Sequence, residues 1–274
     1  MSVKISTKVG IFETGKSDAQ GVSYKNSKLL NCIKKKELEG YNVVEGTEVI
    51  GDLAFLDANV LRCISLPESL KAIGKSAFMQ CLALTEIRIP EGVTEIREST
   101  FDGCSSLQTV SLPESLRSIE EYAFKDCKSL ENITIPDGVE EIGEYAFAGG
   151  ETLRAITLPA SLRTLGKCCF DACKSLVSIR IADGLTEIND YTFDGCGALE
   201  SIELPASVKI LGKDPFGKGL KTLTINAPEI KISKYTFIAA TGLKTIIVPA
   251  GRGAYYRELL DSNYLSKIAV EEMA

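Results

Sequence analysis

The stretch FDGCSSLQTVSLPESLRSI, residues 101–119, contains in one copy the pattern that decides the fold of this chain. Its first residue belongs to a series of phenylalanines spaced by 23 residues, with a last gap of 21: Phe55, Phe78, Phe101, Phe124, Phe147, Phe170, Phe193, Phe216 and Phe237. A constant period of this length predicts a solenoid, in which each coil buries its apolar side against its neighbours. We therefore expect one continuous, elongated repeat domain.

Within the unit, apolar residues stand six, nine and eleven positions after each phenylalanine, as Leu107, Val110 and Leu112 do here. The last two lie on one face of a strand, while the leucine enters the core from the preceding turn. Pro113 ends the strand because proline cannot donate to a hydrogen-bond ladder. Stacked strands predict a parallel sheet on one side of the solenoid. The small residue before each phenylalanine predicts short strands or helical turns on the other, and the fold class is α/β or mostly β.

Two kinds of coil alternate, so the complete repeat is about 46 residues long. One kind has serine two residues after its proline, as at Ser115, and the other has glycine, as at Gly138. Basic residues such as Arg117 fall in the serine coils, and acidic residues such as Glu140 fall in the glycine coils. Because paired strands lie about 4.8 Å apart, we expect opposite charges on neighbouring coils to form weak surface ladders.

Composition narrows the range of functions. The chain has 274 residues, is 45% hydrophobic, and carries a net charge of -6 with a pI near 5.1. We expect no nucleic-acid partner, because phosphate binding requires clustered lysine and arginine. No apolar run is long enough for a transmembrane segment. The opening MSVKISTKVGIFETG lacks the features of a signal peptide, which leaves a cytoplasmic location open.

Catalysis is not expected from this sequence. The chain contains no histidine, which is the commonest general base and a common metal ligand. Its glutamates follow the repeat and do not converge as the paired carboxylates of a glycosidase must. We therefore predict that the chain is not an enzyme and has no catalytic residue, metal or cofactor.

The motif [AT]-F-x-x-C-x-x-L-x-x-I-x-[LI]-P-x-x-[LV]-x-x-[IL] closely resembles the BspA-like, or Treponema-type, leucine-rich repeats, and residues 78–96 and 124–142 match it almost letter for letter. The resemblance implies a right-handed leucine-rich-repeat array of 23-residue coils with its sheet on the concave side. It also implies a bacterial protein at the cell surface or secreted, which binds host or neighbouring-cell proteins.

The flanks of the array also resemble those of such proteins. Residues 21–30 resemble the hairpin that precedes the repeats, and residues 248–255 resemble the closing segment with a short capping helix. We therefore divide the chain into an N-terminal hairpin or cap (1–40), a solenoid of about nine coils (41–249) and a C-terminal cap with a short helix (250–274).

Five of the nine cysteines occupy one slot, three residues after phenylalanine, which favours a buried and reduced ladder over disulfides. They are Cys81, Cys104, Cys127, Cys173 and Cys196. Of the cluster formed by Cys168, Cys169 and Cys173, only Cys168 is expected to be exposed. Metal binding usually requires pairs of cysteines spaced by two residues, so this cluster does not favour it.

A partner would meet the outward strand positions, which lie seven, eight and ten residues after each phenylalanine. These rows are rich in hydroxyls and carry charges of both signs, and the rows at seven and ten contain no aromatic residue. From them we select the protein-binding candidates Arg62, Arg88, Gln108, Thr134, Arg154, Thr157, Arg180 and Glu203. The alternative interpretation is a solvated sheet surface without a ligand.

A second row consists of tyrosines two residues before phenylalanine, namely Tyr122, Tyr145, Tyr191 and Tyr235. Tyrosine is enriched at interfaces, but amphipathic rings also pack flat over apolar surface.

The leading hypothesis is therefore a non-enzymatic interaction module, monomeric, which binds a host or neighbouring-cell protein through the sheet and serves in cell adhesion. The alternative is a structural spacer or a self-assembling repeat protein with no small-molecule chemistry.

Overall fold

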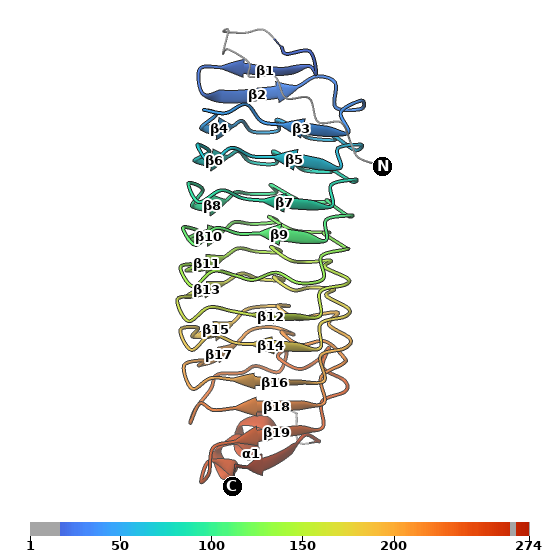
Figure 1. Ribbon diagram of the computed structural model, residues 1–274. Helices are drawn as coiled ribbons and strands as arrows, with labels where there is room; N and C mark the ends of the chain where they lie inside the picture. The colour runs from blue at the N-terminus through green and yellow to red at the C-terminus, as the bar shows by residue number, and fades with distance from the viewer. Residues whose placement is uncertain (1–16, 264–266, 274) are drawn as a thin grey trace.

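The computed structural model describes residues 17–263 and 267–273 as a parallel β-solenoid of about eleven turns with coils of about 23 residues (Figure 1). A hairpin lies at one end of the stack and a single α-helix at the other. Of the two fold classes that the sequence predicted, α/β and mostly β, the structure has the second. One contiguous apolar core runs through the coils from Val22 to Leu260.

One side of the solenoid, called the sheet face below, consists of the strands that follow the leucine of each repeat. Neighbouring strands are parallel and in register, with Glu86 opposite Thr109 and Ala155 opposite Ser178. The strands are β3 (Gly40–Asn42), β5 (Cys63–Ser65), β7 (Glu86–Arg88), β9 (Thr109–Ser111), β12 (Ala155–Thr157), β14 (Ser178–Arg180), β16 (Ser201–Leu204), β18 (Thr222–Ile225) and β19 (Thr245–Val248).

The ladder of the sheet face is divided into hydrogen-bonded groups, and the predicted sheet is therefore not continuous. The groups are β3-β5, β7-β9, β12-β14 and a larger one that begins with β16. Between β9 and β12, one coil contributes only an isolated bridge from Asn132 to Ala155. The shortened coil shifts the register between β16 and β18, where Ser201 pairs with Thr222.

The adjoining side carries strands of two residues each, which end on the buried aliphatic residue of the repeat. They are β4 (Val49–Ile50), β6 (Ala72–Ile73), β8 (Glu95–Ile96), β10 (Ser118–Ile119), β11 (Glu141–Ile142), β13 (Thr164–Leu165), β15 (Glu187–Ile188) and β17 (Ile210–Leu211). The sequence predicts short strands or helical turns at the small residue before each phenylalanine, but these strands end several residues earlier, and the small residues such as Ala123 lie in turns.

The repeated phenylalanines form a continuous stack inside the solenoid, which confirms the prediction of an aromatic spine. All nine rings lie with centroids 5.3–6.2 Å apart and planes within 12° of parallel. The first eight are at most 1% exposed, and Phe237 at the end is 5% exposed. Offset stacking at this spacing is favourable for aromatic rings.

The phenylalanines stand on tight turns, called the turn side below. Two residues of such a turn have left-handed backbone, for example Tyr122 (φ 58) and Asp126 (φ 55). Backbone hydrogen bonds still connect the coils here, since the N–H of Phe124 donates to Ala146 (2.8 Å) and that of Asp126 to Ala148 (2.7 Å). The turn side therefore also holds neighbouring coils at a fixed spacing.

The alternation of serine and glycine coils reflects contacts between neighbours. The Ser115 hydroxyl donates to the carbonyl of Val93 in the preceding glycine coil (2.9 Å). A side chain at Gly92 would collide with the carbonyl oxygen of Leu70 in the serine coil before it. The glycine thus lets the backbone of the preceding serine coil come close, and the serine bonds the backbone of the preceding glycine coil.

Of the basic residues in the serine coils, one forms the predicted charge ladder and three bond their own turns, namely Arg117, Arg163 and Lys209. Lys71 pairs with Glu48 in the preceding coil (2.6 Å), whereas Arg117 donates to the carbonyl of its neighbour Leu116 (2.9 Å). The guanidinium reaches its own turn because the turn presents carbonyl oxygens that lack a ladder partner. Arg117 and Arg163 thus satisfy carbonyl oxygens of their own turns and do not pair with a neighbouring coil.

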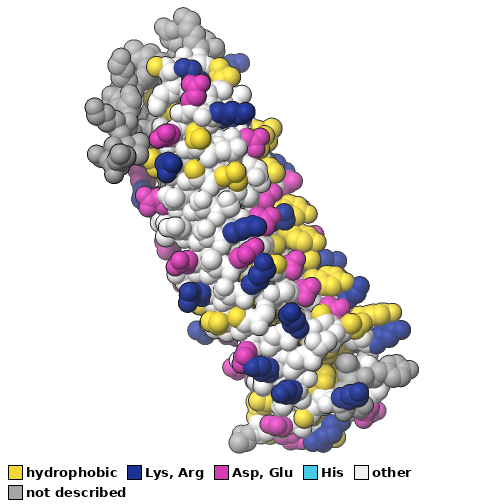
Figure 2. Space-filling view, turned by 90° about the vertical axis from the view of Figure 1, so that its right-hand side faces the viewer, with side chains coloured by type: hydrophobic (Ala, Val, Ile, Leu, Met, Phe, Trp, Pro, Cys, Tyr) yellow, Lys and Arg dark blue, Asp and Glu magenta, His cyan; other side chains and the backbone are white. Residues whose placement is uncertain are grey.

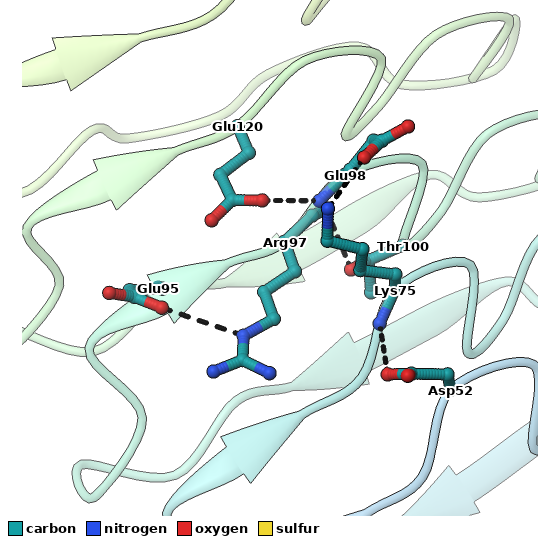
Figure 3. Close-up of polar contacts among 7 residues, drawn as sticks. All are labelled: Asp52, Lys75, Glu95, Arg97, Glu98, Thr100 and Glu120. Carbon is teal, nitrogen blue, oxygen red and sulfur yellow. Dashed lines mark hydrogen bonds and ion pairs between the residues drawn. The ribbon is translucent and has the colours of Figure 1, made fainter.

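Beside the two-residue strands, polar side chains connect successive coils (Figure 3). The backbone N–H of Lys75 donates to Asp52 (3.0 Å), and its ammonium donates to Glu98 (2.8 Å). The N–H of Glu98 in turn donates to Glu120 (2.9 Å), and Arg97 pairs with Glu95 in its own coil (3.5 Å). Such exposed pairs contribute little stability each.

The N-terminal end of the described stack is an antiparallel hairpin of β1 (Val22–Lys25) and β2 (Lys28–Cys32). Strand β2 then pairs in parallel with β4. The hydroxyls of Tyr24 and Tyr41 lie 2.6 Å apart, and Tyr41 donates to the carboxylate of Asp18 (2.7 Å). Burial and these two contacts raise the pKa of Tyr41.

At the other end, helix α1 (Gly253–Ser262) is followed by a strand that the sequence did not predict. This strand, β20 (Ala269–Glu272), pairs in parallel with β19 and adds a further coil. The Glu272 carboxylate accepts hydrogen bonds from the N–H groups of Gly251 (2.5 Å) and Gly253 (3.0 Å). It thereby satisfies free donors at the start of α1.

Candidate protein-interaction surface

The outward residues of the sheet face alternate with core residues along each strand, as the period of a β-strand requires. In β7, for example, Ile87 is buried between exposed Glu86 and Arg88. All eight predicted binding residues are exposed. Arg88, Thr157, Arg180 and Glu203 lie in strands, Arg62, Gln108 and Arg154 lie directly before strands, and Thr134 lies in the coil that forms only a bridge.

Among the described residues, two grooves on the sheet face bring together half of the predicted residues. Groove one has a volume of about 730 Å³, runs over β5, β7, β9 and the segment 132–136, and contains Arg88 and Thr134. Groove two has a volume of about 590 Å³ and contains Arg180 and Glu203. The other four predicted residues lie outside both linings: Arg62, Gln108, Arg154 and Thr157.

Small polar side chains form much of the floor of groove one. Ser65, Thr109, Ser111 and Thr134 contribute hydroxyls, and Asn132 contributes an amide. Longer side chains stand between and beside them, so the surface is shallow and rich in hydrogen-bond donors and acceptors. Such a floor admits the backbone of a partner segment more readily than a bulky side chain.

Some charges of the sheet face are paired and others are not. The guanidinium of Arg88 pairs with the carboxylate of Glu68, which raises the pKa of Arg88. Glu203 accepts a hydrogen bond from the side-chain amide of Asn226 (2.8 Å). Among the described residues of the sheet face, the guanidinium groups of three arginines have no partner: Arg62, Arg154 and Arg180.

Our selection missed several groove residues. Cys63, Glu86 and Asn132 line groove one and stand eight residues after their phenylalanines. That row points outward as the neighbouring rows do, so the period alone could have found it. Glu114 comes from the turn after the proline, and no period of the strand indicates its direction.

The cysteine ladder is confirmed. All nine cysteines are unpaired, and the five in the repeated slot are at most 1% exposed. Each of these five thiols donates to the carbonyl of a phenylalanine in an earlier coil, at 3.1–3.3 Å. Burial raises the pKa of Cys173 to about 12, so its reactive thiolate form is scarce at neutral pH.

The expectation that Cys168 is exposed is wrong. Cys168 is only 8% exposed. It stands two residues before Phe170, in the position that tyrosine occupies in other coils, and has the same left-handed backbone (φ 53). The hydroxyl of Tyr145 contacts this thiol through a side-chain hydrogen bond, which raises the pKa of Tyr145 to about 12. Cys63, on the sheet face, is instead the thiol that is partly accessible.

The tyrosine row lies on the turn side and is partly packed. Tyr122 and Tyr145 stack with ring centroids 5.2 Å apart, and the ammonium of Lys213 lies 5.3 Å from the ring centre of Tyr191. Tyr235 is 47% exposed. In Figure 2, hydrophobic side chains follow one another along one edge of the solenoid, among charged ones of both signs. Tyr122, Tyr145 and Tyr191 are half-buried, which fits the packing interpretation for these three, whereas Tyr235 is exposed.

Within residues 17–263 and 267–273, no three acidic or cysteine side chains come together in a way that could hold a metal ion. In the same residues, no helix has the length and apolarity needed to cross a membrane.

Parallel coils of about 23 residues around a phenylalanine spine, with an exposed strand face, define a leucine-rich-repeat protein. The profile of the BspA-type leucine-rich-repeat region, with six copies, matches residues 30–154 and 140–258. The chain therefore belongs to the BspA-type leucine-rich-repeat family. Repeat proteins of this class typically act as protein-interaction modules and generally have no catalytic site.

One solved bacterial structure shares the fold, and a second is similar in sequence. A leucine-rich-repeat protein from Bacteroides ovatus is 25% identical, with a TM-score of 0.63 over 97% of this chain and 76% of that one. The leucine-rich-repeat protein of T. pallidum is 22% identical, with a TM-score of 0.48 over 89% of this chain and 95% of that one. Among curated proteins, no sequence matches significantly.

Proposed function

We propose that this chain is a non-enzymatic module that binds a partner protein through its sheet face. The observation that carries the proposal is the combination of two grooves on one rigid parallel face with unpaired arginines beside them. Open faces of solenoids are the surfaces on which such proteins bind partners. The eight predicted residues remain our candidates, with Cys63, Glu86 and Asn132 added from groove one.

We propose further that the module serves in adhesion, at the cell surface or after secretion, and that it binds a host or neighbouring-cell protein. The resemblance of the repeats to BspA-like proteins supports this setting. Protease treatment of intact native cells tests it, because only a surface-exposed module would be cleaved while cytoplasmic proteins remain whole.

Two threonines of one coil provide a matched test of the binding face. Thr157 is exposed in β12 on the sheet face, and Thr164 is exposed in β13 on the adjoining side. We would immobilise the wild type, Thr157→Tyr and Thr164→Tyr and measure binding to a panel of purified extracellular-matrix and serum proteins. A bulky ring in the middle of an interface should weaken binding by about tenfold or more, as for other central interface residues.

Both substitutions add a ring at a solvent-exposed strand position, so neither should change stability by more than about 0.5 kcal/mol. The proposal predicts that Thr157→Tyr loses binding and that Thr164→Tyr keeps it. Equal binding by both variants would refute the sheet face as the site. If no protein of the panel binds and light scattering shows assemblies of the chain, the spacer or self-assembling alternative replaces the proposal.

A further inference from the structure

Groove one lies in an acidic part of the sheet face. It runs over four successive coils, which contain β5, β7, β9 and the segment 132–136, and the three strands follow one another down the stack (Figure 1). In each coil, the outward strand positions and the first residue after the proline form the surface around the groove. These surface segments are residues 62–68, 85–91, 108–114 and 131–137. They contain six acidic and two basic residues, so their net charge is -4 and they attract a positively charged partner.

The acids that line the groove are not neutralised by its one arginine. Arg88 pairs with Glu68, so these two charges cancel. Glu86 and Glu114 are the other charged residues of the lining, and neither forms an ion pair within the described residues. The lining together with Glu68 therefore has a net charge of -2.

The other bases nearby leave the surface acidic. Arg62, which the count above includes, lies in the first of the four coils and outside the lining. Arg117 follows the turn of the third coil, where its guanidinium donates to the carbonyl oxygens of Glu114 (3.2 Å) and Leu116 (2.9 Å). With Arg117 added, the net charge of the surface is still -3.

A row of acids follows the turns beside the groove. Glu91, Glu114 and Asp137 each come directly after the proline in three successive coils, and all three are exposed. Glu91 accepts a hydrogen bond from the N–H of Ser115 (3.4 Å) and keeps its charge. With about 4.8 Å between coils, the Cα atoms of the row span about 10 Å. Carboxylates stacked at this spacing repel one another, so cations placed along the row relieve an unfavourable interaction.

These acids favour several separate cations over one metal ion. They lie at successive positions along the groove, and among the described residues no three acidic or cysteine side chains converge in a way that could hold a metal. The amines of a polypeptide can be spaced as the acids are. Between the charges, Ser111 and Thr134 supply hydroxyls and Asn132 an amide, which can donate to and accept from the backbone of an extended chain.

We propose that groove one binds an extended basic segment of the partner protein, whose lysine or arginine side chains pair with Glu91, Glu114 and Asp137. Alternate residues of an extended chain point to the same side, and three of them cover about 13 Å. The flexible stems of lysine bridge the difference from the row of about 10 Å. Complementary charge of this kind selects the partner and speeds its association. This inference rests on the proposed function and specifies the chemistry of the partner at one groove.

Groove two provides a comparison on the same face. Its surface segments, residues 177–183, 200–206 and 221–227, contain three acidic and two basic residues, so their net charge is only -1. A basic segment should therefore prefer groove one.

The probe is a synthetic peptide with lysine at three alternate positions, separated by serines. A second peptide has glutamine in place of the three lysines. We would measure direct binding of both to the wild type and to the double variant Glu114→Gln and Asp137→Asn. The matched control, Asp183→Asn and Glu203→Gln, removes the same charge from exposed positions at groove two. Circular dichroism would verify that all variants are folded.

The expected result is selective binding of the lysine peptide, weakened about tenfold in the groove-one variant and unchanged in the groove-two control. Binding should also weaken as salt is added. Equal affinity for the two peptides, equal affinity of the two variants, or no binding of the lysine peptide would overturn the inference. So would binding of Ca²⁺ at groove one in place of the peptide.

Failure here differs from failure of the proposed function. If Thr157→Tyr abolishes capture of a panel protein while the lysine peptide neither binds nor displaces that protein, the face binds a partner of other chemistry. The inference is then wrong and the proposed function stands. If the face captures nothing, the proposed function itself is wrong.

Discussion

The aromatic spine offers a quantitative prediction at its centre. The Phe124 side chain is fully buried, and its ring lies 5.3 Å from that of Phe101 and 5.4 Å from that of Phe147. The substitution Phe124→Ala removes the ring from between two stacked neighbours. Phe237 is a natural comparison, because it ends the spine, is 5% exposed and stacks at 6.2 Å on Phe216 alone.

Replacing a buried phenylalanine by alanine costs about 3–5 kcal/mol, depending on how far the site collapses. Collapse at Phe124 is restricted, because its N–H donates to Ala146 (2.8 Å) and Phe101 donates to Ala123 (2.9 Å), which keep the coils at their spacing. We therefore expect a cost near 5 kcal/mol at Phe124. At Phe237, with one stacked neighbour and some exposure, we expect about 2–3 kcal/mol.

Urea denaturation followed by circular dichroism measures both variants against the wild type. The shift of the transition midpoint gives the change in the free energy of unfolding if the slope is unchanged. A cost below about 1 kcal/mol for Phe124→Ala, or a larger cost at Phe237 than at Phe124, would refute a continuous packed spine.

Three further predictions test the coil contacts. Iodoacetamide should modify Cys63 in the folded protein and Cys173 only after denaturation, as mass spectrometry can show, because burial raises the pKa of Cys173 to about 12. The hairpin end should lose stability above about pH 10, where tyrosine ionises in the unfolded chain but the raised pKa keeps Tyr41 neutral in the folded one. Because the pKa values of Tyr24 and Tyr256 are also raised, Tyr41→Phe should reduce this slope without abolishing it in thermal unfolding at increasing pH. Gly92→Ala should cost about 1–3 kcal/mol in urea denaturation, since its methyl meets the backbone carbonyl of Leu70.

The repeat made most of the fold predictable. Every coil must bury the same face, so the spacing from Phe55 to Phe216 specifies the spine, the cysteine ladder and the sheet together. The sequence did not predict strand β20, because this strand is not part of the 23-residue repeat. No phenylalanine precedes β20 at the repeat spacing, and its pairing with β19 depends on how the chain returns after α1.

The candidate surface was predictable as a set of outward positions but not as a set of contacts. Exposure of Arg88 follows from strand alternation, since it adjoins buried Ile87. Arg154 is exposed because it stands in the turn directly before β12, two residues before buried Ile156, and alternation would have pointed it inward. That Arg88 pairs with Glu68 while Arg154 remains unpaired depends on side-chain rotamers and on the turn after the proline. Cys168 was misplaced for a related reason, because a left-handed residue does not follow the alternation of a strand.

Site-specific photo-crosslinking tests most directly whether the sheet face is where a partner protein binds. A photoreactive amino acid would be introduced at residue 157 in β12 or, in a separate protein, at residue 164 in β13, and each protein would be irradiated with the captured partner. The account predicts a covalent product from position 157 and none from position 164. Crosslinking from position 164 alone, or equally from both, would contradict it.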